Sequence, residues 1–586
     1  MSASTWDRAM AMQAAGRADD AIAMVRVQQR LRPRDPELMN LMAVLLWGTG
    51  RLDEALRQAE RAVSLQPANG SFLNTLGVTL SFMDRLHDAV AAWERATAVD
   101  PRNPLAWISL AGTLPRVGRS GDGVEAGRRG VELDPGSAAA RNALAGALKN
   151  AGRMDEAVEA AREAVALAPG DARLRSQLLL YMNYASVPAD ALAREHRAFG
   201  AACPPARDAA RTDPDHGRPL RIGILSGDLK DHSVAFFVDA ILDTVPDGST
   251  CAAFSTMVAG EGDAVAARLR GRFAEWVDAW KLTDDALDEA IRARRIDVLV
   301  ELSGHTSGSR LAALRSAPAP VIVTAIGYPN TTGLPAVGWR IVDSITDPPG
   351  SEALCTERLL RIDPCFLCYR PPEGAPEPVM PPAGAPVTFA SFNNAAKVGD
   401  ECASLWARVL RAVPGSRMLM KSASLAEAAV RDSVAARMAA AGIGADRLEL
   451  VARTASRAEH LALYSRVHVA LDTVPYNGTT TTCEAMWMGV PVVCMLGDRH
   501  AARVSASLVA AAGHPGWAAA DADGFVATAA RLAGDPGGLA RIRSGLRAGM
   551  AASALMDARA YGARFHEALR RGWSSWCDGQ RPASRP

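Results

Sequence analysis

Five 17-residue stretches, each ending in proline, decide the fold of the first part of this chain. They read RADDAIAMVRVQQRLRP (17–33), RLDEALRQAERAVSLQP (51–67), RLHDAVAAWERATAVDP (85–101), RSGDGVEAGRRGVELDP (119–135) and RMDEAVEAAREAVALAP (153–169). The prolines are therefore 34 residues apart every time. Self-similarity at one fixed period is typical of proteins built from stacked copies of a small structural unit.

Each copy has the features of a pair of helices. A turn such as Gly50-Arg51 or Gly152-Arg153 separates two helical runs, and small residues recur where the helices approach, for example Ala55, Ala89 and Ala157. This period and pattern define tetratricopeptide repeats (TPR). Stacked repeats form a superhelix with an extended concave surface, so we predict that residues 1–185 are TPR repeats that bind a polypeptide.

One repeat departs from this pattern. It carries Gly123, Gly127 and Gly130 at its three small positions and Pro115 in its first helix. Glycine costs about 1 kcal/mol relative to alanine inside a helix, so three glycines remove about 3 kcal/mol. We expect this repeat to be less stable than its neighbours. It could act as a hinge, or the neighbouring repeats could stabilise it enough to tolerate an Ala/Gly-rich sequence.

Asparagine recurs at one position in the first helix of three repeats. These residues are Asn40, Asn74 and Asn142, and Ile108 takes their place in the glycine-rich repeat. A side-chain amide both donates and accepts hydrogen bonds, so a row of amides can bind an extended peptide backbone without reading its sequence. We predict that these asparagines bind a peptide; the alternative is that they are only solvated.

The rest of the chain has the pattern of an α/β protein. After a linker (186–217), short apolar runs that read as buried parallel strands alternate with Ala-rich helical stretches. The runs are 222–225, 296–300, 321–326, 387–392, 418–420, 448–451, 467–471 and 490–495. A proline-rich connection (371–386) divides them, which predicts two Rossmann-like lobes, 218–385 and 386–575, with a ligand cleft at the carboxyl ends of the strands. Residues 576–586 are predicted to be a disordered tail.

The most informative stretch of the second lobe is NGTTTTCEAMWMG (477–489), which reads as a loop followed by a helix. Asn477, Gly478, Thr479, Thr480 and Thr481 lie at the expected start of that helix, where free N–H groups, hydroxyls and the positive end of the helix dipole suit a diphosphate. Glu484 would lie one turn inside, where a carboxylate can accept hydrogen bonds from ribose hydroxyls. The alternative is a Thr-rich helix cap with a surface glutamate.

Lys397 is a second candidate for phosphate chemistry. It follows the predicted strand 387–392, and it is one of only five lysines (149, 230, 281, 397, 421) in a chain whose other basic residues are arginine. A compact ammonium group suits a developing phosphate charge. The alternative is a solvated lysine after a strand.

Two histidines are candidates in the first lobe. His232 lies in SGDLKDHS (226–233) after the first predicted strand, and His305 lies in ELSGHT (301–306) after another. An imidazole titrates near neutrality, so either could accept a proton from a substrate. The alternative for each is a structural histidine of a loop.

The composition excludes several classes of protein. Sixty-five Lys+Arg against 64 Asp+Glu give a net charge of +1 over 586 residues, so nucleic acid is not an expected partner. No signal peptide and no apolar run of about 18 residues is found, so we expect no membrane span. Nine scattered cysteines favour a reducing cytoplasm over a disulfide framework. The lone pair Cys365 and Cys368 does not make a zinc site, and we predict no bound metal.

With these segments in one order behind TPR repeats, the chain resembles the O-GlcNAc transferase and SPINDLY family of protein O-glycosyltransferases. The most specific segments are GYPNTTGLP (327–335), FNNAAK (392–397) and the stretch 471–491. The resemblance implies a GT-B fold of two Rossmann-like lobes. It also implies a metal-independent, inverting transfer of a sugar from a nucleotide diphosphate to Ser or Thr of an acceptor protein that the TPR repeats bind.

The resemblance also implies roles for individual residues. Lys397 corresponds to the lysine that stabilises the leaving diphosphate, and His232 to a histidine at the sugar and acceptor site that was once proposed as general base. His305 falls in the matching Gly-His-Thr turn and completes the catalytic candidates. The predicted donor-binding residues are Asn394, Arg457, His460, Asn477, Gly478, Thr479, Thr480, Thr481 and Glu484.

Two positions resemble plant SPINDLY more than the animal enzymes. Ala396 stands where the animal enzymes carry tyrosine, and Glu484 replaces their aspartate. UDP-GlcNAc is the predicted donor, with GDP-fucose as the alternative that these positions favour, and flagellin is one candidate acceptor. One alternative hypothesis is a non-catalytic TPR scaffold with a nucleotide-sugar sensor. Another is a small-molecule or lipid glycosyltransferase, but such an enzyme would have no function for the repeats. The sequence leaves open whether the chain forms a homo-oligomer.

Overall fold

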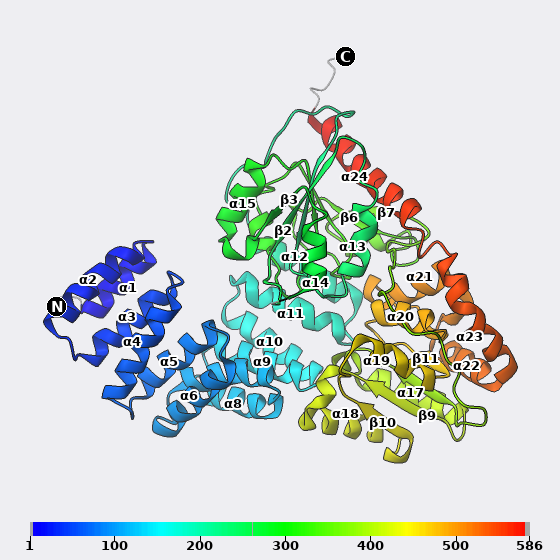
Figure 1. The fold of residues 1–586 in the computed structure, drawn as a ribbon, viewed down its shortest axis with the longest axis horizontal. Coiled ribbons are helices and arrows are strands. Elements are labelled where there is room, and N and C mark those ends of the chain that lie inside the picture. Colours follow the sequence, from blue (N-terminus) through cyan, green and yellow to red (C-terminus); the bar gives the residue numbers. More distant parts are fainter. Residues whose placement is uncertain (1–3, 261, 581–586) are drawn as a thin grey trace. The chain divides into compact units, whose positions relative to one another are not determined.

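The computed structural model describes residues 4–260 and 262–580 and divides into two compact units (Figure 1). The first unit extends to Ala168 and includes Glu427–Ser433. The second unit holds the rest of the chain and contains two parallel β-sheets. A TPR array followed by two Rossmann-like lobes is the fold class that the sequence predicts.

The first unit is built from helix pairs, drawn from blue to cyan in Figure 1. The helices are α1 (Thr5–Ala14), α2 (Ala18–Leu31), α3 (Pro36–Trp47), α4 (Leu52–Leu65), α5 (Gly70–Phe82), α6 (Leu86–Val99), α7 (Pro104–Thr113), α8 (Ser120–Leu133), α9 (Ala138–Asn150) and α10 (Met154–Leu167). A short 3₁₀ turn, η1 (Leu114–Val117), follows α7. Its position coincides with Pro115, which cannot donate the hydrogen bond that would continue an α-helix.

The 34-residue period also fixes where the first helix of each pair begins. The side chains of Asp35, Asn69, Asn103, Ser137 and Asp171 each cap a helix by accepting a hydrogen bond from a backbone N–H of the first turn. Each capping residue comes two positions after a repeat proline. Such caps contribute about 1 kcal/mol each, so the sequence signals the same helix start in every repeat.

The glycine-rich helix α8 is closely packed in the structure. A Cβ placed on Gly127 would lie 2.9 Å from Cα of Leu144 in α9, and one on Gly123 would lie 3.0 Å from Pro115. A Cβ on Gly130 would lie 3.2 Å from Ile108. The glycines therefore let α8 approach its neighbours more closely than alanine would allow.

The first sheet of the second unit has seven parallel strands in the order β3-β2-β1-β4-β5-β6-β7. They are β1 (Arg221–Ser226), β2 (Thr250–Ser255), β3 (Glu275–Val277), β4 (Val298–Glu301), β5 (Val321–Thr324), β6 (Trp339–Val342) and β7 (Arg358–Arg361). The associated helices are α11 (Ala172–Tyr184), α12 (Ala189–Ala201), α13 (Ala235–Leu242), α14 (Ala264–Arg270), α15 (Asp284–Ala293) and α16 (Leu311–Leu314). The strand order reverses between β1 and β4.

The second sheet has six parallel strands in the order β10-β9-β8-β11-β12-β13. They are β8 (Thr388–Ser391), β9 (Arg417–Lys421), β10 (Leu448–Val451), β11 (Val469–Leu471), β12 (Val492–Met495) and β13 (Ala518–Ala519). The helices are α17 (Asp400–Ala412), α18 (Ala428–Ala440), α19 (Arg457–Ala462), α20 (Thr480–Trp487), α21 (Val504–Ala511), α22 (Ala522–Gly534), α23 (Pro536–Ala551) and α24 (Ala558–Gln580). Here the strand order reverses between β8 and β11.

All eight predicted strands are present, and β2, β3, β6, β7 and β13 are additional. The stretch 186–217, predicted as a linker, contains helix α12. Residues 576–580, predicted to begin a disordered tail, form the last turn of α24, whereas 581–586 lie outside the described residues. Helix α24 follows the second sheet in sequence but packs on the first lobe, where His566 Nε2 lies 2.9 Å from the carbonyl oxygen of Ile241 in α13.

Candidate active site

The candidate site lies at the carboxyl edge of the second sheet. Strands β8 and β11 flank the point where the strand order reverses, and this is where parallel α/β sheets bind ligands. Lys397 follows β8 through the short turn η4 (Ala395–Lys397), and Asp472 follows β11 directly. The loop from residue 473 to 479 then leads into α20, so the predicted phosphate residues reach the same edge.

Lys397 contacts the loop that precedes α20. Its Nζ donates a hydrogen bond to the backbone carbonyl of Asn477 at 2.7 Å and lies 4.2 Å from the ring centre of Tyr476. The Tyr476 ring stacks on Tyr184 of α11 at 4.7 Å, which fixes the aromatic surface beneath the ammonium group. The lysine predicted from its rarity in the chain is therefore held beside the Gly-Thr loop.

Burial lowers the pKa of Lys397 to about 8, and the nearby Asp472 carboxylate opposes this shift. Asp472 is 1% exposed, and burial raises its own pKa. Asp472 is not among the predicted site residues, although it directly precedes the predicted loop. At neutral pH the lysine carries its proton and can stabilise an anion at this edge.

The turn at Gly478 depends on the absence of a side chain. Its N–H donates to Asp472 Oδ1 at 2.7 Å, and its carbonyl accepts a hydrogen bond from Ser505 at 2.9 Å. A Cβ at this position would lie 2.7 Å from the hydroxyl oxygens of both Thr481 and Thr482. Glycine is thus required for the loop to pack against the first turn of α20.

The threonines of this loop differ in their surroundings. Thr479 is the residue that precedes α20. Thr481 donates to Asn393 Oδ1 at 3.1 Å, whereas the buried hydroxyl oxygen of Thr480 has no hydrogen-bond partner within residues 4–260 and 262–580. Buried polar groups without hydrogen-bond partners are uncommon, and a hydroxyl at the start of a helix can donate a hydrogen bond to a phosphate oxygen of a ligand.

Glu484 belongs to a chain of three polar side chains. The Lys421 ammonium, at the end of β9, donates to His460 Nδ1 at 2.7 Å, and His460 Nε2 lies 3.0 Å from Glu484 Oε2. Because Nδ1 accepts a hydrogen bond, Nε2 carries the hydrogen and donates it to the carboxylate. One oxygen of the 7% exposed Glu484 is thereby fixed, and the orientation of the whole carboxylate with it.

Lys421 was missed by the sequence analysis. It is one of the five lysines, which was the available signal, but nothing in its local sequence indicates the contact with His460. Burial lowers its pKa. His460 itself packs against Phe392 and Tyr464, with ring centres 5.6 and 5.9 Å apart respectively.

His232 lies on the loop after β1, in the first lobe. Its side chain is 45% exposed, and its Nδ1 accepts a hydrogen bond from Val234 N–H at 3.3 Å and lies 3.4 Å from Asp228 Oδ1. Burial raises the pKa of Asp228. Arg457 of α19 donates to Asp231 at 2.7 Å and lies over the Phe236 ring, so this predicted donor-binding residue joins the second lobe to the His232 loop.

His305 has a different environment from His232. It is 3% exposed, its Nε2 donates to the carbonyl of Thr332 at 2.8 Å, and its Nδ1 accepts from the Ser176 hydroxyl at 2.8 Å. Its ring packs edge-on against Phe199 of α12, and burial lowers its pKa to about 4. Both nitrogens are used inside the protein, so this geometry favours a structural role that attaches α11 and α12 to the first lobe.

Asn394 and Asn477, two further predicted residues, form hydrogen bonds within their own loops. Asn394 is exposed, and its Oδ1 accepts from Ala396 N at 3.1 Å, which shapes the turn before Lys397. Asn477 is buried and donates to the carbonyl of Thr473 at 2.9 Å.

The three repeat asparagines lie in the other unit, on α3, α5 and α9. Asn40 is 2% exposed, and Asn74 and Asn142 are half-buried. The Oδ1 atoms of all three are buried, and each lacks a hydrogen-bond partner in the part of the chain that the structure describes. The same amide environment therefore recurs with the repeat.

The described residues include neither a metal-binding cluster nor a membrane-spanning helix. Within residues 4–260 and 262–580, no group of three His, Cys, Asp or Glu side chains is arranged to hold a metal ion. None of the helices described is both long enough and apolar enough to cross a membrane.

Comparison with known proteins identifies the family. A profile described as Glycosyl transferase family 41 matches residues 205–368 and 380–565. The chain belongs to this family. Tetratricopeptide-repeat profiles match residues 7–71, 74–136 and 114–172. The family 41 match thus includes Lys397, His460 and Glu484, and the TPR matches include the three asparagines.

Individual members of family 41 are similar over much of this chain. A probable UDP-N-acetylglucosamine–peptide N-acetylglucosaminyltransferase, SPINDLY of Arabidopsis thaliana, is 37% identical over 379 residues, which are 64% of this chain and 41% of the relative. The protein named SEC from the same plant is 25% identical over 378 residues, 62% of this chain and 38% of SEC. The chain therefore spans only about two fifths of the length of these relatives.

A solved structure of a family member covers more of this chain. A mutant O-GlcNAc transferase of Thermobaculum terrenum superposes with a TM-score of 0.81 and 31% identity, over 88% of this chain and 99% of that protein. The TPR array and both lobes thus recur together in a solved bacterial structure.

Proposed function

We propose that this protein is an inverting protein O-glycosyltransferase. It would transfer a sugar from a nucleotide diphosphate to a Ser or Thr hydroxyl of a polypeptide bound by the TPR repeats, with UDP-GlcNAc as the donor. The observation that carries the proposal is the placement of the Lys397 ammonium beside the Gly-Thr loop at the start of α20, at the reversal point of the second sheet.

The chemistry follows from what these residues can stabilise. The acceptor oxygen attacks the anomeric carbon, and the bond from that carbon to the diphosphate oxygen breaks, so negative charge develops on the leaving diphosphate. Lys397, the N–H groups at the start of α20 and the Thr480 hydroxyl would stabilise that charge without a metal ion. Glu484, oriented by His460, would accept hydrogen bonds from the ribose.

The acceptor hydroxyl must also lose its proton. His232 is the candidate for this step because its side chain is accessible and its ring lies 3.4 Å from the Asp228 carboxylate. A carboxylate at this position stabilises the imidazolium that forms when the proton is taken up. The buried His305, which was predicted beside it, would instead hold the surrounding loops in place.

GDP-fucose is the second candidate donor. Ala396 and Glu484, which resemble the plant SPINDLY pattern, favour it. The residues described above recognise a diphosphate and a ribose, which both donors contain.

The repeats would supply the acceptor protein, with flagellin as one candidate. The amides of Asn40, Asn74 and Asn142 recur at one repeat position and keep unpartnered oxygens. We expect replacement of Asn74 and Asn142 by alanine to raise KM for a protein acceptor while leaving KM for the donor unchanged. The nine cysteines, all free in the structure, fit the cytoplasmic location that forms part of the proposal.

The test is donor binding followed by transfer. Thermal stabilisation of the full chain by a panel of UDP-, GDP- and CMP-sugars would be measured for the wild type, Lys397→Ala and Glu484→Gln. We expect one donor to stabilise the wild type and to lose most of this effect in Glu484→Gln. That donor should then be transferred to protein by the wild type but not by a folded Lys397→Ala. A protein that neither binds nor turns over any donor would be a scaffold.

A further inference from the structure

Two stacked tyrosine rings lie beneath the ammonium group of Lys397. The ring of Tyr476 stacks on that of Tyr184, with ring centres 4.7 Å apart and planes inclined by 20°. Lys397 Nζ lies over the Tyr476 ring, 4.2 Å from its centre. Since Tyr184 occupies one face of this ring, the ammonium group takes the other. Helix α11, the loop before α20 and the turn after β8 therefore meet at the lysine.

Hydrogen bonds fix the backbone on both sides of the Tyr476 ring. The Thr473 hydroxyl donates to the carbonyl of Tyr476 at 2.6 Å, and the Asn477 N–H donates to the carbonyl of Ala501 at 2.9 Å. The Asn477 side chain also donates to the carbonyl of Thr473 at 2.9 Å. The protein itself thus sets the position from which the ring contacts Lys397.

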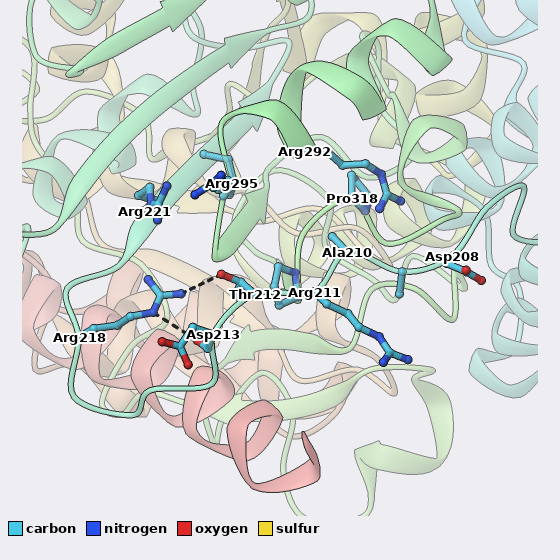
Figure 2. Close-up of a pocket in the computed structure, with 13 residues that line it drawn as sticks. Asp208, Ala210, Arg211, Thr212, Asp213, Arg218, Arg221, Arg292, Arg295 and Pro318 are labelled. Atoms are coloured by element: carbon cyan, nitrogen blue, oxygen red, sulfur yellow. Dashed lines mark hydrogen bonds between the residues drawn. The ribbon is translucent and has the colours of Figure 1, made fainter. Parts of the chain in front are cut away.

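Lys397 differs in its partners from a structural cation such as Arg218, which lines the hollow drawn in Figure 2. Arg218 donates to the Thr212 hydroxyl and the Asp213 carbonyl, both at 3.4 Å, and to both carboxylate oxygens of Asp297, at 2.7 and 2.8 Å. These contacts satisfy its donors and neutralise its charge. With the residues that the structure describes, the Lys397 ammonium forms one hydrogen bond, to a carbonyl, and no ion pair.

An aromatic ring suits such a lysine better than a carboxylate would. The face of the ring attracts a cation through its quadrupole but adds no negative charge. One of the three N–H donors of Lys397 binds the Asn477 carbonyl, and the ring covers another side of the ammonium group. At least one donor and the whole positive charge therefore remain available to a phosphate oxygen. Asp472 lies near enough to affect the lysine but forms no ion pair with it.

We propose that Tyr476 is a positioning residue for the transfer reaction and that Tyr184 acts through it. The Tyr476 ring holds the Lys397 ammonium where it meets the leaving diphosphate, and Tyr184 supports the opposite face of that ring. This inference rests on the proposed transferase function. The contacts use the rings and not the hydroxyl groups, so phenylalanine should be able to replace Tyr476.

Lysine NMR of the full chain tests the contact directly. The chain contains only five lysines, so carbon-13 labelling of the lysine Cε gives five signals, and the one absent from Lys397→Arg belongs to Lys397. The ring current of Tyr476 should shift the Cε protons of Lys397 upfield. We expect this shift to persist in Tyr476→Phe and to vanish in Tyr476→Leu. An unshifted Lys397 signal in the wild type, or a shift that survives Tyr476→Leu, would overturn the proposal.

Kinetics test whether the contact serves the reaction, at a temperature where every variant is folded. For the donor that stabilises the wild type, kcat/KM should fall about tenfold or more in Tyr476→Leu and stay within about twofold in Tyr476→Phe. Trp280→Leu is the matched control, because it removes a ring whose centre lies 4.9 Å from Nζ of the exposed Lys281. It should leave kcat/KM unchanged. Equal losses in the Phe and Leu variants of Tyr476 would refute the role of the ring.

Tyr184 provides a further test, through a double-variant cycle. If Tyr184 acts only through Tyr476, Tyr184→Leu should lower kcat/KM of the wild type but have no further effect in Tyr476→Leu. Losses that add up would refute this link. A wild type that turns over no donor would refute the transferase function, whereas the NMR signal of Lys397 would still decide whether the ring holds the ammonium group.

Discussion

The pH dependence of turnover is the sharpest prediction, because it depends on one ammonium group. Burial places the pKa of Lys397 at about 8. The group is then about nine-tenths protonated at pH 7 and about one-tenth protonated at pH 9. If the charged form is the one that binds and stabilises the leaving diphosphate, kcat/KM for the donor falls about tenfold for each unit of pH above 8.

The assay is kcat/KM for the donor, from initial rates at donor concentrations well below KM, between about pH 6 and pH 10, with the protein checked for folding at each pH. Lys397→Arg provides the internal test, since guanidinium keeps its charge throughout this range. Its rate should be lower than that of the wild type by about 10²–10³, because the hydrogen bond to Asn477 is misplaced, but its alkaline decline should be absent.

Lys281→Arg is the matched control, because Lys281 is an exposed lysine with a side chain that is 58% accessible. It should reproduce the wild-type profile, including the decline. Two results would refute the reasoning: a wild-type rate that stays level up to pH 10, or a decline near pH 8 that persists in Lys397→Arg. Either would mean that the Lys397 ammonium is not the group whose loss limits turnover.

Three further predictions concern packing and the polar contacts. Gly127→Ala should destabilise the TPR unit by about 1–3 kcal/mol, because its Cβ would lie 2.9 Å from the facing helix; Gly112→Ala, with open space around it, should be neutral or stabilising in the same chemical denaturation experiment. Lys421→Met should raise KM for the donor more than it lowers kcat, because Lys421 acts through His460. Steady-state kinetics would measure both constants, and an unchanged KM would contradict this role. His305→Gln should lower Tm but leave the shape of the pH profile of turnover unchanged, because the imidazole is neutral and both of its nitrogens form hydrogen bonds within the protein. A shifted pH profile would instead indicate that His305 accepts a proton during turnover.

The repeat half of the fold was predictable because its signals are local. The period of 34 residues marks the prolines, and the capping residues that follow them, such as Asn69 and Asn103, act within one turn of the chain. Buried strands with continuous apolar runs, such as β4 and β12, were predictable for the same reason. Strand β2 was missed because its sequence TCAAFS has few large apolar residues, and the strand is identified by its pairing with β1 and β3.

Site residues that directly follow a strand could be predicted, whereas residues that contact each other across a long stretch of sequence could not. Lys397 and Glu484 lie in motifs that also mark a strand end and a helix start. Lys421 reaches His460 across 39 positions of sequence, and no local pattern encodes that approach. His305 differs from these residues. Its position after β4 suggested a reactive imidazole, but its Nδ1 accepts a hydrogen bond from Ser176 of α11, a contact that the local sequence does not indicate.

The position of α24 has a consequence for synthesis. The helix follows the second sheet in sequence, yet it supplies the first lobe with Tyr561, which donates to the carbonyl of Phe366 at 3.0 Å, and with the buried Trp573, which donates to the carbonyl of Asp215 at 2.9 Å. A growing chain therefore completes the second sheet before the first lobe can be closed. Since domains usually fold in order as they leave the ribosome, the α13 surface stays uncovered until α24 has emerged. Deletion of α24 should thus harm the lobe that is made first.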